Sequence, residues 1–398
     1  MSRSNVTSRK RDDSIADIQD SRNLQDDISV KGKIACRRHL SLEDKILNRI
    51  DLDSKIREFH EDIRQNNVEQ VRRSLEAGIN ANAQDIATGK LPLIEATNLG
   101  HVEIVKVLLA AHADVNLTNI QGFTALHVSV NPKVFNQEIV QLFLERRNAN
   151  YNIQDKMTES TPMHILCKVC TSGKNINTST LHSILKEMVP RCDLELKDKL
   201  GNTPLHIIAM GKKEDVEAME IILLARPNIN IKNNLGEIPV ATAIDHGNFL
   251  SALAMLKYEI DTNVRDRSQY SLLHYAAKKN ASELIKKLLE KGCDPNAQDI
   301  NGDTALHIAA GRGFVQATLV LLKHPKIDRN MQNFGGYTPL MCAVDSGFLK
   351  VVKLLIAAKC DIHVKSPETN KTVLDIAKEL FKKRNRRDIY DFLIHGKY

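Results

Sequence analysis

A short motif returns along most of this 398-residue chain, and its spacing restricts the fold more than any other feature of the sequence. Its clearest copy is Thr203-Pro204-Leu205-His206, and the nine equivalent copies begin at Leu91, Thr124, Thr161, Thr203, Ile238, Ser271, Thr304, Thr338 and Thr372. Successive copies are separated by 33, 37, 42, 35, 33, 33, 34 and 34 residues. A period of this size is typical of an array of stacked units, each of which buries its apolar face only against its neighbours.

Each letter of the motif has a local structural reason. A Thr or Ser at the first position can accept hydrogen bonds from backbone N–H groups at the start of a helix. Proline fits the next position, where its missing N–H costs nothing; it stands at Pro92, Pro162, Pro204, Pro239 and Pro339. Two residues before the cap, a turn with positive φ favours glycine, which is found at Gly89, Gly122, Gly201, Gly236, Gly302 and Gly336. The motif therefore predicts a tight turn followed by a helix.

A second, amphipathic helix is predicted in each unit. Apolar residues lie on one helical face at Leu284, Ile285, Leu288 and Leu289, and the same pattern recurs from Ile104 to Leu109, from Ile139 to Leu144 and from Val351 to Ile356. The chain has no Trp and 4% aromatic residues, although 42% of it is hydrophobic. A core of Ala, Val, Ile and Leu is typical of thin layers of small helices.

The period and the motif together resemble the ankyrin repeat, a β-turn finger followed by two antiparallel helices. The resemblance implies an all-α solenoid of about ten helix–turn–helix units. It also implies that the motif histidines are structural and bridge backbone groups of neighbouring fingers; they are His127, His164, His206, His274 and His307. The 42-residue spacing before Thr203 is attributed to a longer polar turn over residues 171–179.

The domain boundaries follow from where the motif begins and weakens. Residues 1–50 are expected to form a mostly disordered basic extension, with a helix over 42–50. Residues 51–86 are expected to be an N-terminal capping unit, residues 87–364 regular repeats, and residues 365–398 a C-terminal capping repeat with a basic cluster. Polar terminal units are what solubility of such an array requires.

The distribution of charge argues against nucleic acid as a partner. The net charge is +7, but residues 51–364 carry 36 basic and 36 acidic residues, and the excess lies at the two ends. A nucleic-acid binder is expected to carry its positive charge on the folded surface. No stretch of the sequence reaches the roughly 18 apolar residues of a membrane span, so we expect no membrane partner. The seven Cys form no disulfide-like framework, which is typical of a reducing compartment. We therefore expect a soluble monomer in the cytoplasm with access to the nucleus.

Candidate chemistry is sparse. His164, Cys167 and Cys170 form an H-x-x-C-x-x-C pattern that a zinc ion could use, with His182 or Cys192 as a fourth ligand. Paired C-x-x-C knuckles are absent, and a buried Cys that acts as a small hydrophobe is the commoner case. The sequence contains no phosphate-binding Gly-rich loop, nucleophile elbow or H-E-x-x-H motif. We therefore predict no enzyme activity, catalytic residue, cofactor or metal.

Two residues are candidate modification sites. Ser41 follows Arg37 and Arg38 in a pattern that resembles a basophilic kinase site, although it could simply cap a helix. Asn116 lies eight residues after Leu108 and directly after an acidic and an aliphatic residue. This context resembles that of the asparaginyl hydroxylase that acts on ankyrin repeats, but Asn recurs structurally at such turns. The basic run at residues 382–387 resembles a nuclear-import signal, or it is a solvated face of the capping helix.

The predicted function is that of a non-catalytic scaffold that binds a protein partner through its concave face. Aromatic side chains next to basic ones are enriched at binding hot spots, and the candidates are Phe123, Arg267, Tyr270, Lys278, Lys279, Arg312, Phe334 and Tyr337. This set indicates an acidic or mixed apolar and acidic partner segment. Two alternatives stay open: a regulator similar to the inhibitor-of-kappa-B family that sequesters a Rel-type transcription factor, and a ubiquitin-ligase substrate receptor. An Asp-Ser-Gly-x-x-Ser phosphodegron is missing, because Ser14 is followed by Ile15.

Overall fold

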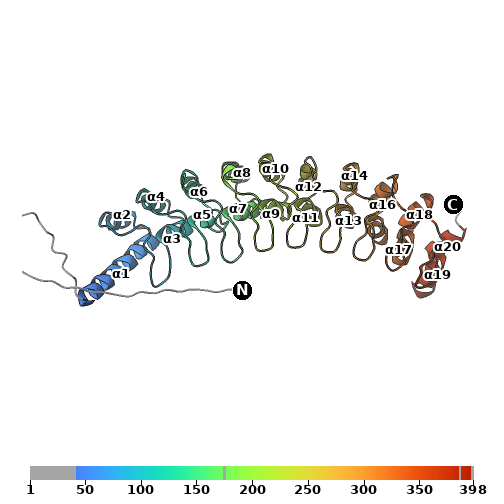
Figure 1. The fold of residues 1–398 in the computed structure, drawn as a ribbon, viewed down its shortest axis with the longest axis horizontal. Helices are drawn as coiled ribbons and strands as arrows, with labels where there is room; N and C mark the ends of the chain where they lie inside the picture. Colours follow the sequence, from blue (N-terminus) through green and yellow to red (C-terminus); the bar gives the residue numbers. More distant parts are fainter. Residues whose placement is uncertain (1–41, 174–175, 385–386, 396–398) are drawn as a thin grey trace, which may run out of the picture. The chain divides into compact units, whose positions relative to one another are not determined.

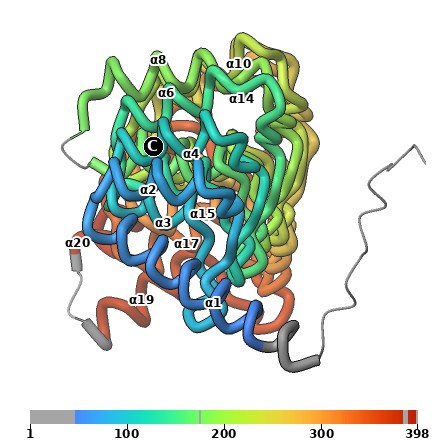
Figure 2. The backbone as a smooth tube through the Cα atoms, turned by 90° about the vertical axis from the view of Figure 1, so that its left-hand side faces the viewer, coloured from blue at the N-terminus to red at the C-terminus, as the bar shows by residue number. Residues whose placement is uncertain are grey.

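The repeat units form two rows of short helices in the computed structural model, which describes residues 42–173, 176–384 and 387–395. The chain divides into two compact units, Met1–Arg49 and Ile50–Tyr398, and the second of them holds the repeats. Inner helices contact the inner helices of adjacent repeats, and outer helices do the same (Figure 1). Figure 2 looks along the rows, with outer helices such as α6, α8 and α10 above inner helices such as α3 and α17. The predicted all-α ankyrin solenoid is confirmed.

The described residues contain ten helix pairs, each an inner helix followed by an outer one. The inner helices are α1 (Leu42–Arg64), α3 (Pro92–Leu99), α5 (Ala125–Ser129), α7 (Pro162–Cys170), α9 (Pro204–Ala209), α11 (Pro239–His246), α13 (Leu272–Lys278), α15 (Ala305–Gly311), α17 (Pro339–Ser346) and α19 (Val373–Arg384). The outer helices are α2 (Val68–Glu76), α4 (Val102–Ala110), α6 (Gln137–Leu144), α8 (Thr178–Met188), α10 (Val216–Leu224), α12 (Phe249–Met255), α14 (Ser282–Glu290), α16 (Val315–Leu322), α18 (Leu349–Ala357) and α20 (Arg387–His395), and a 3-10 turn (Val189–Arg191) follows α8.

The inner helices begin where the motif predicts. The side chains of Thr124, Thr161, Thr304 and Thr338 accept a hydrogen bond from the backbone N–H three residues later. Ile238 cannot do so, and its helix starts without a side-chain cap. The Pro that follows the cap occupies the first helical turn at five helices. Local sequence thus fixes the start of each inner helix.

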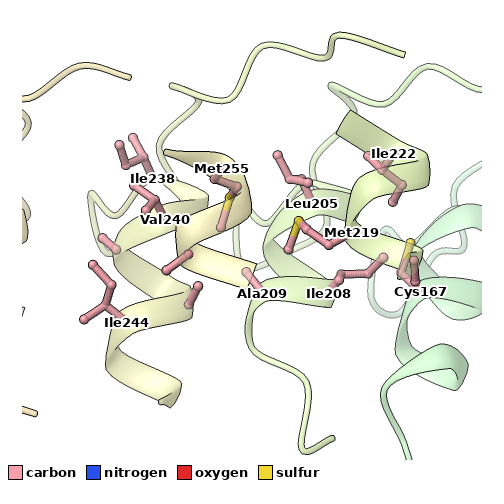
Figure 3. Packing of buried hydrophobic residues seen from close by; sticks show 14 of the residues in the cluster. Cys167, Leu205, Ile208, Ala209, Met219, Ile222, Ile238, Val240, Ile244 and Met255 are labelled. Carbon is pink, nitrogen blue, oxygen red and sulfur yellow. The ribbon is translucent and has the colours of Figure 1, made fainter. Parts of the chain in front are cut away.

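The core is a continuous layer of small apolar side chains between the two rows (Figure 3). Cys167, Leu205 and Ala209 come from inner helices, and Met219 and Ile222 from an outer helix; all are almost completely buried. Burying Leu- or Ile-sized side chains contributes roughly 1.5–3 kcal/mol each. Because every unit shares this layer with its neighbours, no unit can keep its core alone.

The fingers are joined to one another at their tips. All six motif glycines have positive φ, and Glu159, which replaces the glycine in one finger, has φ of 55°. Backbone hydrogen bonds connect consecutive tips, as from Asn234 N to Leu200 O (3.0 Å) and from Arg267 N to Leu235 O (3.0 Å). The fingers therefore form a row whose spacing is fixed by the backbone.

The ends of the array have their own features. The expected boundary between residues 50 and 51 falls within α1, which runs unbroken from Leu42 to Arg64. Phe59 and Ile63 supply its buried face. The long polar turn expected at residues 171–179 ends at α8, which begins at Thr178 with Asn177 as its cap. None of the helices in the described ranges is long and apolar enough to cross a membrane.

Candidate functional site

The five motif histidines form a repeated bridge between units. In His127, Nδ1 accepts the backbone N–H of Thr124 (3.1 Å), so Nε2 carries the proton and donates it to the carbonyl of Ser160 in the next finger (3.1 Å). His164, His206, His274 and His307 repeat both contacts, with carbonyls 29 to 38 residues later in the chain. The structural role implied by the ankyrin resemblance is confirmed. These side chains are unavailable for chemistry.

Burial sets the protonation of these histidines. It lowers the pKa of His127 and of His206 to about 4, and it lowers the pKa of His164, His274 and His307 as well. The backbone carbonyls that accept from Nε2 oppose this shift only in part. Neutral imidazole is the form that can accept at Nδ1 and donate at Nε2 at the same time.

A groove of about 310 Å³ crosses the inner face of three consecutive units near the C-terminal end. We call it the C-terminal groove; its lining includes Tyr270, Asp303, Ile308, Arg312, Tyr337 and Asp345. Three of the predicted partner-binding residues, Tyr270, Arg312 and Tyr337, thus lie in one place. Phe334 belongs to the same turn as the lining residue Asn333, but its side chain is 69% exposed and lies outside the groove.

The predicted aromatic anchors are not equivalent. Only Phe334 of the four is exposed, whereas Phe123, Tyr270 and Tyr337 are half-buried. Tyr270 stacks on His274 (5.3 Å between ring centroids) and meets Tyr275 edge-on (5.6 Å), so its ring also supports its own unit. Phe123 contacts the ring of His127 (5.7 Å). The rings of Phe123 and Tyr270 therefore also contribute to the packing of their own units.

The predicted cations differ even more. Lys278 lies 3.0 Å and Lys279 3.8 Å from Asp245 Oδ1, so a carboxylate neutralises much of their charge. Arg267 lies at a finger tip. Arg312 is exposed in the C-terminal groove, and no carboxylate oxygen of the described residues lies within 4.0 Å of it. Sequence reasoning overlooked Asp245, because only the stacking of units brings this carboxylate beside Lys278 and Lys279. It also overlooked Asp303 and Asp345, which line the same groove as Arg312.

Phe123 lies in a second groove, far along the chain from the first. This N-terminal groove has a volume of about 460 Å³, and its lining includes Lys90, Ile94, Glu95, Leu99 and Ile120. The Phe123 side chain lines it together with these residues. The structure therefore separates Phe123 from the seven other predicted binding residues.

A buried charge cluster supports the wall of the N-terminal groove. His60 Nδ1 lies 2.7 Å from Glu95 Oε2, and His60 Nε2 lies 2.8 Å from the carbonyl of Ala83. The His60 ring is thus held between a carboxylate oxygen and a backbone carbonyl oxygen. Burial opposes ionisation of Glu95, but hydrogen bonds from His60 and Lys90 lower its pKa. A Glu inside an apolar inner helix was the sequence signal that could have revealed this cluster.

The remaining candidates are placed as follows. Ser41 lies outside the described residues, and so does part of the basic run at 382–387. Cys167 and Cys170 are buried core residues, and burial raises the pKa of the Cys170 thiol to about 12. His182 lies 2.9 Å from Asp215 Oδ2. No group of three metal-binding side chains comes together in the part of the chain that the structure describes.

Asn116 connects two hairpins through its amide. Its Nδ2 donates to the carbonyl of Asn148 (2.9 Å), and its Oδ1 accepts from the backbone N–H of Asn150 (2.7 Å). Asn296 makes the same pair of contacts to Lys326 and Asp328. The side chain at this position therefore has a structural role whether or not it is modified.

Comparison with known proteins gives one family and several partial relatives. The model of ankyrin repeats in three copies matches residues 59–155, 174–266 and 273–366. The chain is 30% identical over 179 residues to the nuclear factor NF-kappa-B p105 subunit of Gallus gallus, and this match covers 44% of this chain and 18% of that protein. It is 32% identical over 111 residues to NF-kappa-B inhibitor alpha of Sus scrofa, a match that covers 26% of this chain and 35% of that protein. It is 26% identical over 255 residues to E3 ubiquitin-protein ligase KEG of Arabidopsis thaliana, a match that covers 60% of this chain and 15% of that protein. The matched regions span well under two thirds of these relatives.

Proposed function

Since the chain belongs to the family of ankyrin-repeat proteins, whose repeats are a protein-interaction fold, we propose that it is a non-catalytic scaffold that binds a partner protein through the C-terminal groove. The observation that carries this proposal is the placement of Tyr270, Tyr337 and exposed Arg312 around one groove. Interface hot spots are enriched in Tyr and Arg that line such pockets. Arg312 favours an acidic group of the partner segment, and the two Tyr rings favour apolar side chains, while Asp303 and Asp345 add negative charge to the same groove.

Truncating the groove should abolish partner recovery. The variant carries Arg312→Ala and Tyr337→Ala, two side chains that line the groove, and it keeps Tyr270 because that ring packs on His274. Loss of hot-spot side chains costs about 2 kcal/mol or more each, so recovery in affinity purification should fall by more than tenfold. Leu224→Ala with Leu250→Ala, at exposed outer-helix positions, is the matched control. Undiminished recovery by a folded groove variant would refute the site.

A second candidate role is regulation of a Rel-type transcription factor. It is favoured by the 32% identity to NF-kappa-B inhibitor alpha over 111 residues. A ubiquitin-ligase substrate receptor is the third, favoured by the match to KEG. The composition of the purified complexes separates these roles, because Rel-homology proteins, cullin components or neither would accompany the chain.

We also propose that the protein is a monomer in the cytoplasm with access to the nucleus. Light scattering would test the oligomeric state, and cell fractionation would test the localisation.

We also propose Asn116 as a site of hydroxylation. The local sequence supports this, while the two amide contacts to the next hairpin require that hairpin to open before an enzyme can reach the side chain. Mass spectrometry of the protein purified from cells should show one added oxygen on the Asn116 peptide. Asn296, which makes equivalent contacts but follows Pro295, should remain unmodified. An unmodified Asn116 peptide at normal oxygen would contradict the proposal.

Phosphorylation of Ser41 is proposed on its sequence context alone, and the same mass spectra test it.

A further inference from the structure

Large apolar side chains are exposed at the tips of most fingers. In the described residues each is between 60% and 69% exposed, and they are Ile86, Ile120, Met157, Leu200, Leu235, Ile300 and Phe334. Only the last of them is among the binding residues predicted from the sequence. A single exposed apolar side chain is unremarkable in a soluble protein, but a repeated series of them on one feature of the fold indicates an interaction surface.

The tips are held in register by the backbone. Lys199 N donates to Thr158 O (2.8 Å), Asn234 N to Leu200 O (3.0 Å) and Arg267 N to Leu235 O (3.0 Å). These bonds connect four consecutive fingers, at residues 148–160, 191–202, 226–237 and 259–270. Met157, Leu200 and Leu235 are therefore presented along a line with little freedom to move apart.

Six basic residues accompany these three apolar ones. They are Lys156, Lys197, Lys199, Lys232, Arg265 and Arg267. We call the nine residues the tip strip. No carboxylate oxygen of the described residues lies within 4.0 Å of any of the six cations. Two other lysines differ, since Lys106 in α4 and Lys257 after α12 both pair with glutamates.

Two lysines of the tip strip, Lys197 and Lys232, donate to carbonyl groups of the next finger. Lys197 Nζ donates to Lys232 O (2.9 Å), and Lys232 Nζ donates to Arg265 O (3.2 Å). An ammonium group has three donors, so each of these lysines keeps donors for a ligand. The ammonium groups consequently lie along the row of fingers, beside the apolar side chains.

Acidic residues of the same turns face the interior. The Asp155 and Asp198 carboxylates accept backbone N–H groups of their own turns. Asp266 accepts from Tyr270 N and from the Tyr275 hydroxyl, and Glu237 is buried. Glu159 is an exposed carboxylate at one of these tips, and Asp193, Glu195, Glu259 and Asp261 are exposed elsewhere in the same fingers. At the tips between Lys197 and Tyr270, the carboxylates thus lie inside the turns and the cations on the outer edge.

We propose that the tip strip binds an extended, acidic segment of a partner protein in which carboxylates alternate with apolar side chains. This inference rests on the proposed protein-binding function and adds a second surface to it, separate from the C-terminal groove. Carboxylates of the segment meet the lysine ammonium groups, and its apolar side chains cover Met157, Leu200 and Leu235. A line of alternating apolar and basic groups fits one extended chain better than the plane of a lipid surface.

The test uses the full chain and a defined probe. The probe is a fluorescein-labelled 20-residue peptide in which Glu, Leu and Ser alternate, and its counterpart carries Gln in place of Glu. Fluorescence anisotropy should show binding of the Glu peptide and binding of the Gln peptide that is about tenfold weaker or less. A charge variant (Lys156→Glu, Lys199→Glu, Lys232→Glu) and an apolar variant (Met157→Ser, Leu200→Ser, Leu235→Ser) should each lose about tenfold or more in affinity.

Control substitutions on the outer helices, or directly after one in the case of Lys323, show whether a loss of binding is specific to the tip strip. Lys286→Glu, Lys323→Glu and Lys350→Glu together impose the same charge change, and Leu224→Ser with Leu250→Ser imposes the same kind of apolar loss. Both should bind the Glu peptide like the wild type. Absence of peptide binding, or equal losses in tip and control variants, would overturn the inference.

A parallel arm tests the lipid alternative. Vesicles of phosphatidylcholine with phosphatidylserine should not sediment the protein in a manner that depends on the tip strip. Sedimentation that the charge variant abolishes, without peptide binding, would assign the surface to lipid and overturn the proposal. The groove variant with Arg312→Ala and Tyr337→Ala should keep peptide binding, so failure of the tip strip and failure of the groove are distinguishable.

Discussion

Lowering the pH from 7 to 4 should remove much of the stability of this protein before most of its carboxylates titrate. Burial lowers the pKa of His127 and His206 to about 4, against 6.5 for an unperturbed histidine. Between these values the unfolded chain binds protons that the folded chain excludes, so unfolding becomes more favourable as the pH falls. The stabilisation is complete above pH 6.5 and is lost as the pH falls to about 4. By linkage, each of the two histidines accounts for about 3 kcal/mol.

Urea unfolding followed by circular dichroism at several pH values between 7 and 4 measures this effect. His206→Gln removes one titrating bridge and should reduce the dependence of the unfolding free energy on pH by up to about 1.4 kcal/mol per pH unit. His112→Gln, at an exposed position, is the control for the substitution itself. The lowered pKa values of Asp155 and Glu95 act at lower pH, where those carboxylates begin to protonate. An unfolding free energy that stays constant from pH 7 to 4.5 would contradict the assignment.

Gly302→Ala should destabilise the protein far more than Gly292→Ala, although both glycines have positive φ (77° and 87°). A Cβ at Gly302 would lie 2.6 Å from Phe334 N and 2.7 Å from its ring, whereas a Cβ at Gly292 would have no atom within 4 Å. Gly292→Ala should therefore cost about 1 kcal/mol, the penalty of an L-residue in the left-handed region. Gly302→Ala should cost about 3 kcal/mol or more, because the next finger must move as well.

Chemical denaturation of the two variants gives the difference directly, and hydrogen exchange locates it. The amide of Phe334, which donates to Asn301 O (3.0 Å), should lose protection in Gly302→Ala and keep it in Gly292→Ala. Equal losses of stability in the two variants would show that the conformation of the turn, and not the close approach of the fingers, determines the need for glycine.

Prediction from the sequence was most successful where a structural role depends on a few neighbouring residues. Thr161 caps its helix, Gly201 takes positive φ, and Ile238 leaves its helix without a side-chain cap, as the motif predicts. These outcomes follow from contacts within about four residues of the chain. The histidine bridge reaches some thirty residues further, and it was predicted only because the resemblance to ankyrin repeats implied it.

The candidate site was predicted less well, for a physical reason. Tyr270, Arg312 and Tyr337 do share a groove, but Phe123 lies in another, and Lys278 is paired with Asp245 from the preceding unit. Whether a surface cation is available depends on carboxylates that the sequence places 33 or more residues away and that the stacking of units brings within 4 Å. A single sequence does not encode those distances locally.

The repeated motif alone predicts the array of units, the start of the nine inner helices that carry it and the turns that need positive φ, because each of these depends on a residue and its immediate neighbours in the chain. Which side chains the array presents to a partner follows from the packing of one unit on the next. The same apolar residue is buried at Leu205 and exposed at Leu200, and the difference lies in whether the adjacent unit packs over it or leaves it at the tip of a finger. Burial is a property of the stack, since it is the neighbouring units that remove a side chain from water.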